Sequence, residues 1–289
     1  MHTNRMDDIL VKVVKELTAP DEYEELFRPH CGGKPLPSLQ VLGEVIALFR
    51  GILFPGYFGT PFVGREAMTY RMGFDIGCLY DRLAAQIQSA LCVDGAHETT
   101  HEQAAAVASQ CIEQLPQLRS RMATDVVATY DGDPAATSYG EVISCYPAIR
   151  AISSYRIAHA LHLLGVPLIP RIITEMAHSE TGIDIHPGAT IGDYFTIDHG
   201  TGVVIGATSI IGNHVKLYQG VTIGARSFPL DVQGNPIKGI DRHPILEDDV
   251  VVYSNSTILG RITIGRGAVI GGNVWVTTDV PPGTKVLQR

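Results

Sequence analysis

Chemically versatile side chains lie in glycine-rich runs of the C-terminal half, where no helix is expected. Asp198 and His199 are adjacent in IDHGTGVVIG; the glycines of this run disfavour helix, and its β-branched residues favour extended chain. A neutral imidazole can take a proton from an attacking hydroxyl, and a carboxylate can hold that imidazole in place. These residue types would suit general-base chemistry on a rigid backbone, but for the histidine taken by itself a hydrogen bond at a corner is the simpler interpretation.

Three further motifs carry side chains of the same kinds. Asp184 lies in DIHPGA and Asp133 lies in DPA, while Asp241, Arg242 and His243 are consecutive in DRHP. DGDPAATS, which contains Asp133, is rich in turn formers, so a turn or a helix cap is the alternative role for this carboxylate.

Two periodicities divide the chain that must position these residues. Up to about Met176 apolar residues recur at three- and four-residue spacing, notably over residues 65–93, 101–130 and 146–165. From about Ile183 the spacing becomes six. The expected guide positions of this repeat are Ile185, Ile191, Ile197, Val203, Ser209, Val215 and Val221, and then Ile245, Val251, Thr257, Thr263, Val269 and Trp275.

A sustained six-residue repeat is typical of a parallel β-helix, in which three hexads complete a triangular coil and aliphatic guide residues stack inside. Neighbouring coils are then about 4.8 Å apart. We predict an α+β protein: an all-helical N-terminal domain over residues 1–176, followed by a left-handed parallel β-helix of hexapeptide repeats over residues 177–289. Residues 226–240 have no hexad period and are expected to leave the coil as one extruded loop, a type of segment that is commonly functional.

Composition narrows the function classes. With 45% hydrophobic residues the 289-residue chain can bury a sizeable core, and its formal charge of −8 argues against a sequence-independent nucleic-acid binder. The five cysteines form no CxxC pair, which suggests reduced thiols. The N-terminus lacks the order of a secretory signal, and the most apolar stretch, residues 41–58, is interrupted by Glu44 and Arg50. We expect a soluble, cytoplasmic protein that does not enter membranes.

The motifs DIHPGATIG, IDHGTGVVIG, VTIG and DRHP, following a helical region that holds DPA and YRIAHAL, resemble the serine O-acetyltransferases of the hexapeptide-repeat acyltransferase superfamily. The resemblance covers residues 133–283. It implies an enzyme that moves an acetyl group from acetyl-CoA, a co-substrate, to the hydroxyl of L-serine, giving O-acetyl-L-serine for cysteine biosynthesis without a metal.

The resemblance also implies roles for individual residues. His199 would be the general base, with Asp184 orienting its ring. Asp133 and Asp198 would take the substrate ammonium, and Arg242 and His243 its carboxylate, which suits the bidentate fork of arginine.

Acetyl-CoA is expected in the groove between neighbouring coils of a homotrimer or a dimer of trimers. Its contacts would be backbone groups near Ile223, Gly224 and Ala225, with Arg226 and Arg261 near its phosphates. The chain departs from the family in the long loop after Ala225 and in the short tail PPGTKVLQR, which lacks a terminal isoleucine. That tail argues against a complex with O-acetylserine sulfhydrylase.

Other functions remain open at the level of sequence. A related O-acyltransferase could use the same base on another hydroxyl, that of a serine relative or a sugar, although Asp133 with Arg242 favours an amino acid. A metal hydratase of the γ-carbonic-anhydrase kind would need three converging ligands, and His186, His199, His214 and His243 are its candidates. A non-catalytic coil is a third alternative. For His186 we expect only a local hydrogen bond at the Pro187 corner.

Overall fold

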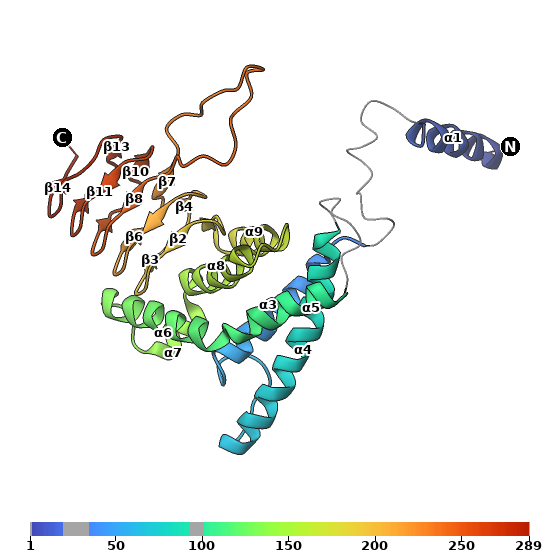
Figure 1. The fold of residues 1–289 in the computed structure, drawn as a ribbon, viewed down its shortest axis with the longest axis horizontal. Helices are drawn as coiled ribbons and strands as arrows, with labels where there is room; N and C mark the ends of the chain where they lie inside the picture. Colours follow the sequence, from blue (N-terminus) through green and yellow to red (C-terminus); the bar gives the residue numbers. More distant parts are fainter. Residues whose placement is uncertain (1, 20–34, 93–100, 289) are drawn as a thin grey trace.

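The computed structural model describes residues 2–19, 35–92 and 101–288. Helices form the N-terminal part, and short parallel strands stacked in coils form the C-terminal part, with one long loop standing out from the stack (Figure 1). The helices are α1 (His2–Leu17), α3 (Leu39–Leu53), α4 (Arg65–Leu91), α5 (His101–Glu113), α6 (Leu115–Gly132), α7 (Tyr139–Cys145), α8 (Pro147–Leu163) and α9 (Ile169–Thr181).

The helical periodicity of the sequence reappears as buried faces. Ser38 caps α3 by accepting a hydrogen bond from the Val41 amide, and Leu42, Val45 and Phe49 of that helix are fully buried at helical spacing. Helix α8 is buried on almost all sides because it lies between the other helices and the first coil. In the described part of the chain, no helix is long and apolar enough to cross a membrane.

Two helix boundaries differ from the simplest interpretation of the sequence. The periodic stretch over residues 101–130 is two helices, divided at Gln114 with Pro116 in the first turn of α6. Helix α9 continues past residue 176 to Thr181 and ends at Gly182, which has a positive φ of 71°. The division of the chain into two domains at residue 176 stays a proposal.

The C-terminal part is a left-handed parallel β-helix with three faces, as predicted. The strand orders are β1-β4-β7-β10-β13, β2-β5-β8-β11 and β3-β6-β9-β12-β14. The strands are β1 (Asp184–Ile185), β2 (Thr190–Ile191), β3 (Thr196–Asp198), β4 (Val204–Ile205), β5 (Ile210–Ile211), β6 (Lys216–Tyr218), β7 (Thr222–Gly224), β8 (Ile245–Leu246), β9 (Val251–Val252), β10 (Thr257–Leu259), β11 (Thr263–Ile264), β12 (Val269–Ile270), β13 (Trp275–Val276) and β14 (Lys285–Val286).

The predicted guide positions are buried only in the first series, and even there the register slips by two residues after Ile197, since Ile185, Ile191 and Ile197 stack on Ile205, Ile211 and Leu217. The seven residues of the first series, from Ile185 to Val221, are all buried. The second series, from Ile245 to Trp275, was wrong by one residue, and Trp275 is 69% exposed. The residues that face inward are its direct neighbours Leu246, Val252, Ile258, Ile264, Ile270 and Val276. Side chains alternate along a strand, so a slip of one residue exchanges the inner and outer faces.

The extruded loop is confirmed. Strand β5 pairs with β8 through Ile210 and Ile245, so the chain between Gly224 and Ile245 is outside the stack while the stack itself continues. An isolated bridge joins Leu230 to Pro236 within this loop, and the Asp231 carboxylate accepts hydrogen bonds from two amides of the same turn.

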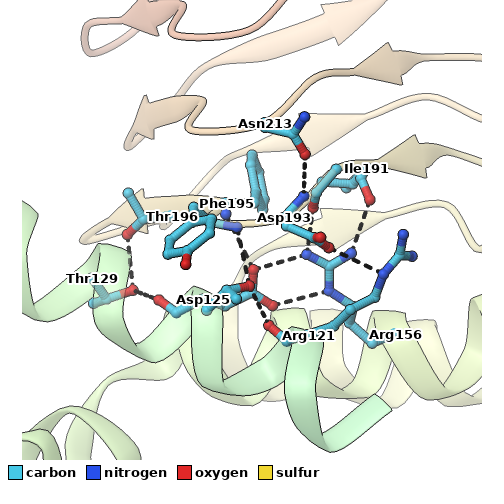
Figure 2. Close-up of polar contacts among 12 residues, drawn as sticks. Arg121, Asp125, Thr129, Arg156, Ile191, Asp193, Phe195, Thr196 and Asn213 are labelled. Carbon is cyan, nitrogen blue, oxygen red and sulfur yellow. Dashed lines mark hydrogen bonds and ion pairs between the residues drawn. The ribbon is translucent and has the colours of Figure 1, made fainter. Parts of the chain in front are cut away.

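A polar junction joins the helices to the first coil (Figure 2). Arg156 of α8 forms a bidentate pair with Asp125 of α6, at 2.8 and 2.9 Å, and also donates to the carbonyls of Ile191 and Gly192. Asp125 in turn accepts from the Phe195 amide at 3.1 Å. The pair is almost fully buried, and it fixes the helices on the coil.

Four cysteines, Cys78, Cys92, Cys111 and Cys145, are free thiols, as expected for reduced cysteines. Cys31 lies outside the described residues.

Candidate active site

The corner between β3 and β4 is two residues longer than the corner directly above it. It holds His199–Val203, whereas Gln219–Val221 joins β6 to β7 on the next coil. His199 has a φ of 56°, a conformation uncommon for a residue with a side chain, and Gly200 and Gly202 also have positive φ. The side chain of His199 is 77% exposed, so the lengthened corner presents the ring to solvent.

Asp198 connects this histidine to a lysine that the sequence analysis did not identify. The Asp198 carboxylate lies 3.8 Å from His199 Nε2 and 3.3 Å from Lys216 Nζ. Lys216 also donates to the Gly132 carbonyl at 2.7 Å. Burial opposes the charge of Lys216, but a hydrogen bond to Tyr218 and the charge of Asp198 raise the pKa of its ammonium.

Asp133 reaches the same corner from the end of α6. Its two carboxylate oxygens accept from the Tyr146 hydroxyl at 2.7 Å and from the Ala135 amide at 2.8 Å. Asp133 therefore has the turn role considered in the sequence analysis, and its carboxylate also contributes a negative charge at this corner. The Tyr146 hydrogen bond lowers the pKa of Asp133, helped by the Ala135 amide and by the charges of Lys216 and His199.

The structure does not bring Asp184 to His199 in the described chain. The Asp184 carboxylate lies 3.8 Å from Arg171 of α9, and no ion pair between Asp184 and His199 is formed among the described residues. Asp184 starts β1, directly beneath Val204 of β4, so it lies close in the fold to the end of the lengthened corner.

A second cluster forms where the extruded loop returns to the coil. His243 Nδ1 accepts from the Thr208 amide at 3.1 Å, and the Thr208 hydroxyl lies 2.9 Å from the same atom. An amide can only donate, so Nε2 carries the ring proton. Burial, together with the positive charge of Arg242, lowers the pKa of His243 to about 4, which keeps the ring neutral. A Cβ on Gly206 would lie 2.0 Å from this ring, so only glycine allows the ring to lie there.

The two arginines of this cluster are bonded differently. Arg261 donates to the carbonyls of Thr208 and His243 and pairs with Asp241, so its guanidinium holds the returning loop in place. Arg242 has a buried Nε that lacks a hydrogen-bond partner among the described residues, and its guanidinium lies 5.7 Å from the Phe228 ring. Arg242 is thus the arginine available to a ligand.

The two clusters occupy different edges of the triangular coil. Asp198 and His199 lie before β4, and the Thr208–His243 contact lies beyond its other end. Electrostatic interactions follow the same division, since Asp133 interacts with Lys216 and His199, while Arg242 interacts with His243 and His186. A free amino acid spans about one residue, roughly 3.6 Å, and cannot bridge both edges of one chain.

The residues predicted to contact acetyl-CoA lie near the start of the extruded loop. Ile223 is fully buried, and its carbonyl accepts from the Gly206 amide, while the Gly224 carbonyl accepts from the Gly260 amide. Ala225 is the first residue beyond β7, and Arg226 is exposed beside Gly260. The strand ladder therefore uses the first two carbonyls and leaves the chain from Ala225 onward for other contacts.

Comparison with known proteins agrees with this geometry. Residues 243–278 match the family described as bacterial transferase hexapeptide (six repeats). A plasmid-encoded serine acetyltransferase of Synechococcus elongatus is 49% identical over 88% of this chain and 82% of its own. The structure of Entamoeba histolytica serine acetyltransferase 1 in complex with L-cysteine has a TM-score of 0.74 and 34% identity, and the similarity covers 88% of this chain and 87% of that one. A Neisseria gonorrhoeae serine acetyltransferase in complex with serine has a TM-score of 0.57 and 26% identity over 91% and 98% of the two chains.

The chain belongs to the serine acetyltransferase family. Its enzyme class, acyltransferase, and its hexapeptide β-helix follow from this membership. Tyr155 and Arg156 of the YRIAHAL motif have a structural role. Tyr155 donates a hydrogen bond to the Ala189 carbonyl, and Arg156 forms the buried junction with Asp125.

The metal-hydratase alternative finds no support in the donor groups. In the ranges the structure describes, the group of three candidate ligands within mutual reach is Glu175, His178 and Asp184, which includes none of the four histidines considered. Arg171 pairs with both carboxylates of that group, so a guanidinium already occupies the position next to these two candidate ligands. His186 accepts from the Gly188 amide at 3.0 Å, which confirms the local hydrogen bond expected at the Pro187 corner.

Sequence reasoning missed three members of these clusters: Lys216, Tyr146 and Thr208. Lys216 and Tyr146 act on carboxylates that lie far away in sequence. A signal for Lys216 was present, since it is a charged residue at an outward position of a hexad, but placing it above the first coil requires the twenty-residue register of that coil.

Proposed function

We propose that this protein transfers the acetyl group of acetyl-CoA to the hydroxyl of L-serine, giving O-acetyl-L-serine and CoA for cysteine biosynthesis. The observation that carries the proposal is the corner where Asp133 and Asp198 flank the outward-turned ring of His199. Two carboxylates suit an ammonium group, and an exposed imidazole suits a hydroxyl. The solved relatives in complex with L-cysteine or with serine support an amino-acid ligand.

In the proposed reaction, His199 accepts the proton of the serine hydroxyl while its oxygen bonds to the thioester carbon. The tetrahedral intermediate then collapses, the carbon–sulfur bond breaks, and the imidazolium returns the proton to the departing thiolate. Asp184 is the proposed orienting partner of the ring. Its present contact with Arg171 is long and partly exposed, and pairs of this kind contribute about 0–1 kcal/mol, so it can be exchanged.

We place the complete site between subunits of a homotrimer or of a dimer of trimers. Arg242 and His243 of one subunit would hold the carboxylate of a serine whose ammonium lies at Asp133 and Asp198 of the next. The different edges occupied by the two clusters support this arrangement. Arg242→Ala should then raise the KM for serine more than it lowers kcat, because the carboxylate is bound equally in the ground and transition states.

Acetyl-CoA is proposed to lie beside Ala225 and Arg226 in the groove between subunits. Arg261 is better assigned to holding the loop than to binding phosphate, because its three contacts are within the chain. Cysteine, which differs from serine in its thiol, should compete for the same site. We also propose a cytoplasmic location.

The test is thiol release from acetyl-CoA with serine, homoserine, phosphoserine and a hexose as acceptors, with sedimentation of the same samples. Serine should be the best acceptor, the active species should be a trimer or hexamer, and cysteine should inhibit competitively. A preference for another hydroxyl would support the related O-acyltransferase instead. Full activity from a monomer would contradict the shared site.

A further inference from the structure

An open cavity of about 630 Å³ lies among three helices of the N-terminal part, apart from the site described above. Helix α3 contributes one wall, and α8 and α9 contribute the others. The lining residues are Gly43, Ile46, Ala47, Arg50, Arg150, Ser154, Met176, Ala177, Ser179 and Glu180.

Arg50 is the unusual member of this lining. Its Nε atom is buried and has no hydrogen-bond partner, and in the described part of the chain no carboxylate pairs with its guanidinium. One face of the guanidinium lies over the Phe58 ring at 4.1 Å, which fixes its position without neutralising its charge. A buried donor without a partner is costly, so a polar ligand at this position is favoured.

A second arginine faces the same space. Arg150 pairs with Glu180, but the charge of Arg150 still acts on Arg50. Burial and, second, this repulsion lower the pKa of Arg50 to about 10. The cavity lining therefore holds two cations and one carboxylate, which leaves a net positive charge for an anion to neutralise.

The remaining walls limit the ligand further. Ile46, Ala47, Met176 and Ala177 form an apolar side, and Ser154 and Ser179 offer hydroxyls. A volume of this size accommodates a small organic molecule rather than a lone inorganic ion. We propose that this cavity binds an organic anion that has a phosphate or carboxylate head at Arg50 and Arg150 and an apolar tail along Ile46 and Met176.

The test measures binding to the full chain by calorimetry and by the shift in Tm, with n-hexyl phosphate, inorganic phosphate and 1-hexanol. Hexyl phosphate should bind saturably and at least about tenfold more tightly than either the head or the tail alone, since both parts of the cavity contribute. Absence of saturable binding of hexyl phosphate would overturn the proposal.

Variants localise the binding. Arg50→Leu should weaken hexyl phosphate binding by about tenfold or more, because a charge-assisted contact is lost. Glu180→Gln should strengthen it by roughly two- to fivefold, since the competing carboxylate is neutralised. If Arg50→Leu does not fold, the other two variants test the site: Glu180→Gln should strengthen hexyl phosphate binding, and Arg150→Gln should weaken it.

Arg82→Gln is the matched control, because Arg82 pairs with Glu44 at 3.1 Å in a neighbouring cavity. Unchanged binding in Arg82→Gln, with the opposite shifts in the other variants, supports the site. If the Arg50 and Glu180 variants bind hexyl phosphate as the natural chain does, or if Arg82→Gln weakens binding equally, the ligand binds elsewhere and the proposal is overturned.

Discussion

Two regions of this molecule use aspartate and basic side chains in opposite ways. At the junction between helices and coil, Asp125 and Arg156 are almost fully buried and form hydrogen bonds with each other and with main-chain groups (Figure 2). At the β3–β4 corner, Asp198 has two long contacts and His199 is mostly exposed. Charged side chains stabilise the fold where they are buried and fully hydrogen-bonded. Where they are exposed and their contacts are long, the same residue types remain able to contact a ligand.

The largest effect should come from His199→Ala. Loss of the proton acceptor is expected to lower kcat by roughly 10²–10⁴-fold, because general-base catalysis contributes about this much. Tm and the oligomeric state should stay unchanged, since the His199 side chain is mostly exposed. Steady-state kinetics and calorimetry measure both. His214→Ala is the control, because His214 also has a positive φ at a corner but stacks on Tyr194. A His199 variant with native kcat would disprove the role.

Arg156→Met should lower stability and leave kcat nearly unchanged, the opposite of the result expected for His199→Ala. It leaves Asp125 buried without its charge partner, which costs about 3–5 kcal/mol of unfolding free energy. Denaturant unfolding measures the loss, and kcat of the folded fraction should change little. Arg121→Met is the matched control at the same junction. Its pair with Asp193 is partly exposed, and its removal should cost about 0–1 kcal/mol. Equal losses in the two variants would refute the distinction between them.

A smaller effect is expected at the contact that links the two kinds of region. Tyr146→Phe removes the hydroxyl that donates to Asp133, so the carboxylate is held by the Ala135 amide alone. One hydrogen bond contributes about 0.5–1.5 kcal/mol, and the KM for serine should rise roughly two- to tenfold with little change in kcat. Tyr139→Phe, whose ring packs on Tyr130, should be silent. An unchanged KM in Tyr146→Phe would leave Asp133 with only its turn role.

The last expected effect depends on pH. His243 is neutral in the fold with a pKa of about 4, whereas an ordinary histidine has a pKa of about 6.5. Between these values the unfolded chain binds a proton that the folded chain does not, so the stability contributed by His243 is complete above pH 6.5 and is lost as pH falls toward 4. Unfolding measured from pH 7 to 4 should show a shallower decline in His243→Asn than in the natural chain. Parallel curves would show that the ring titrates normally.

The sequence predicted the fold better than the contacts within it. A six-residue period survives in the chain because every hexad must place an aliphatic inside, so the β-helix and its loop could be foreseen. The inner face of the second half was predicted wrongly although the sequence carries its signal. The inward residues Leu246, Val252, Ile258, Ile264, Ile270 and Val276 are all aliphatic at six-residue spacing, whereas the predicted series contains Thr257, Thr263 and Trp275. The first coil adds another difficulty, since Asp184 pairs with Val204 and the register there is two residues longer than at Val204 and Thr222.

Candidate site residues were predicted where a sequence motif contained them, and residues that approach these candidates only in three dimensions were missed. Asp133, Asp198 and His199 converge as expected, but the Lys216 and Tyr146 contacts join segments far apart in sequence. Arg261 was predicted to lie near the phosphates of acetyl-CoA. In the structure it donates hydrogen bonds to the carbonyls of Thr208 and His243, and no local sequence pattern indicates these contacts.

The extruded loop has a consequence for how such a protein can change. Its two ends rejoin a stack that keeps its register, and Arg261 fastens the returning end independently of what the loop contains. The loop-closure cost grows only slowly with length, by roughly 0.6 kcal/mol for each doubling. Insertions, deletions or grafted segments between Gly224 and Asp241 can therefore be accommodated without rebuilding the coils. The coils and the extruded loop can therefore evolve, or be engineered, as separate modules.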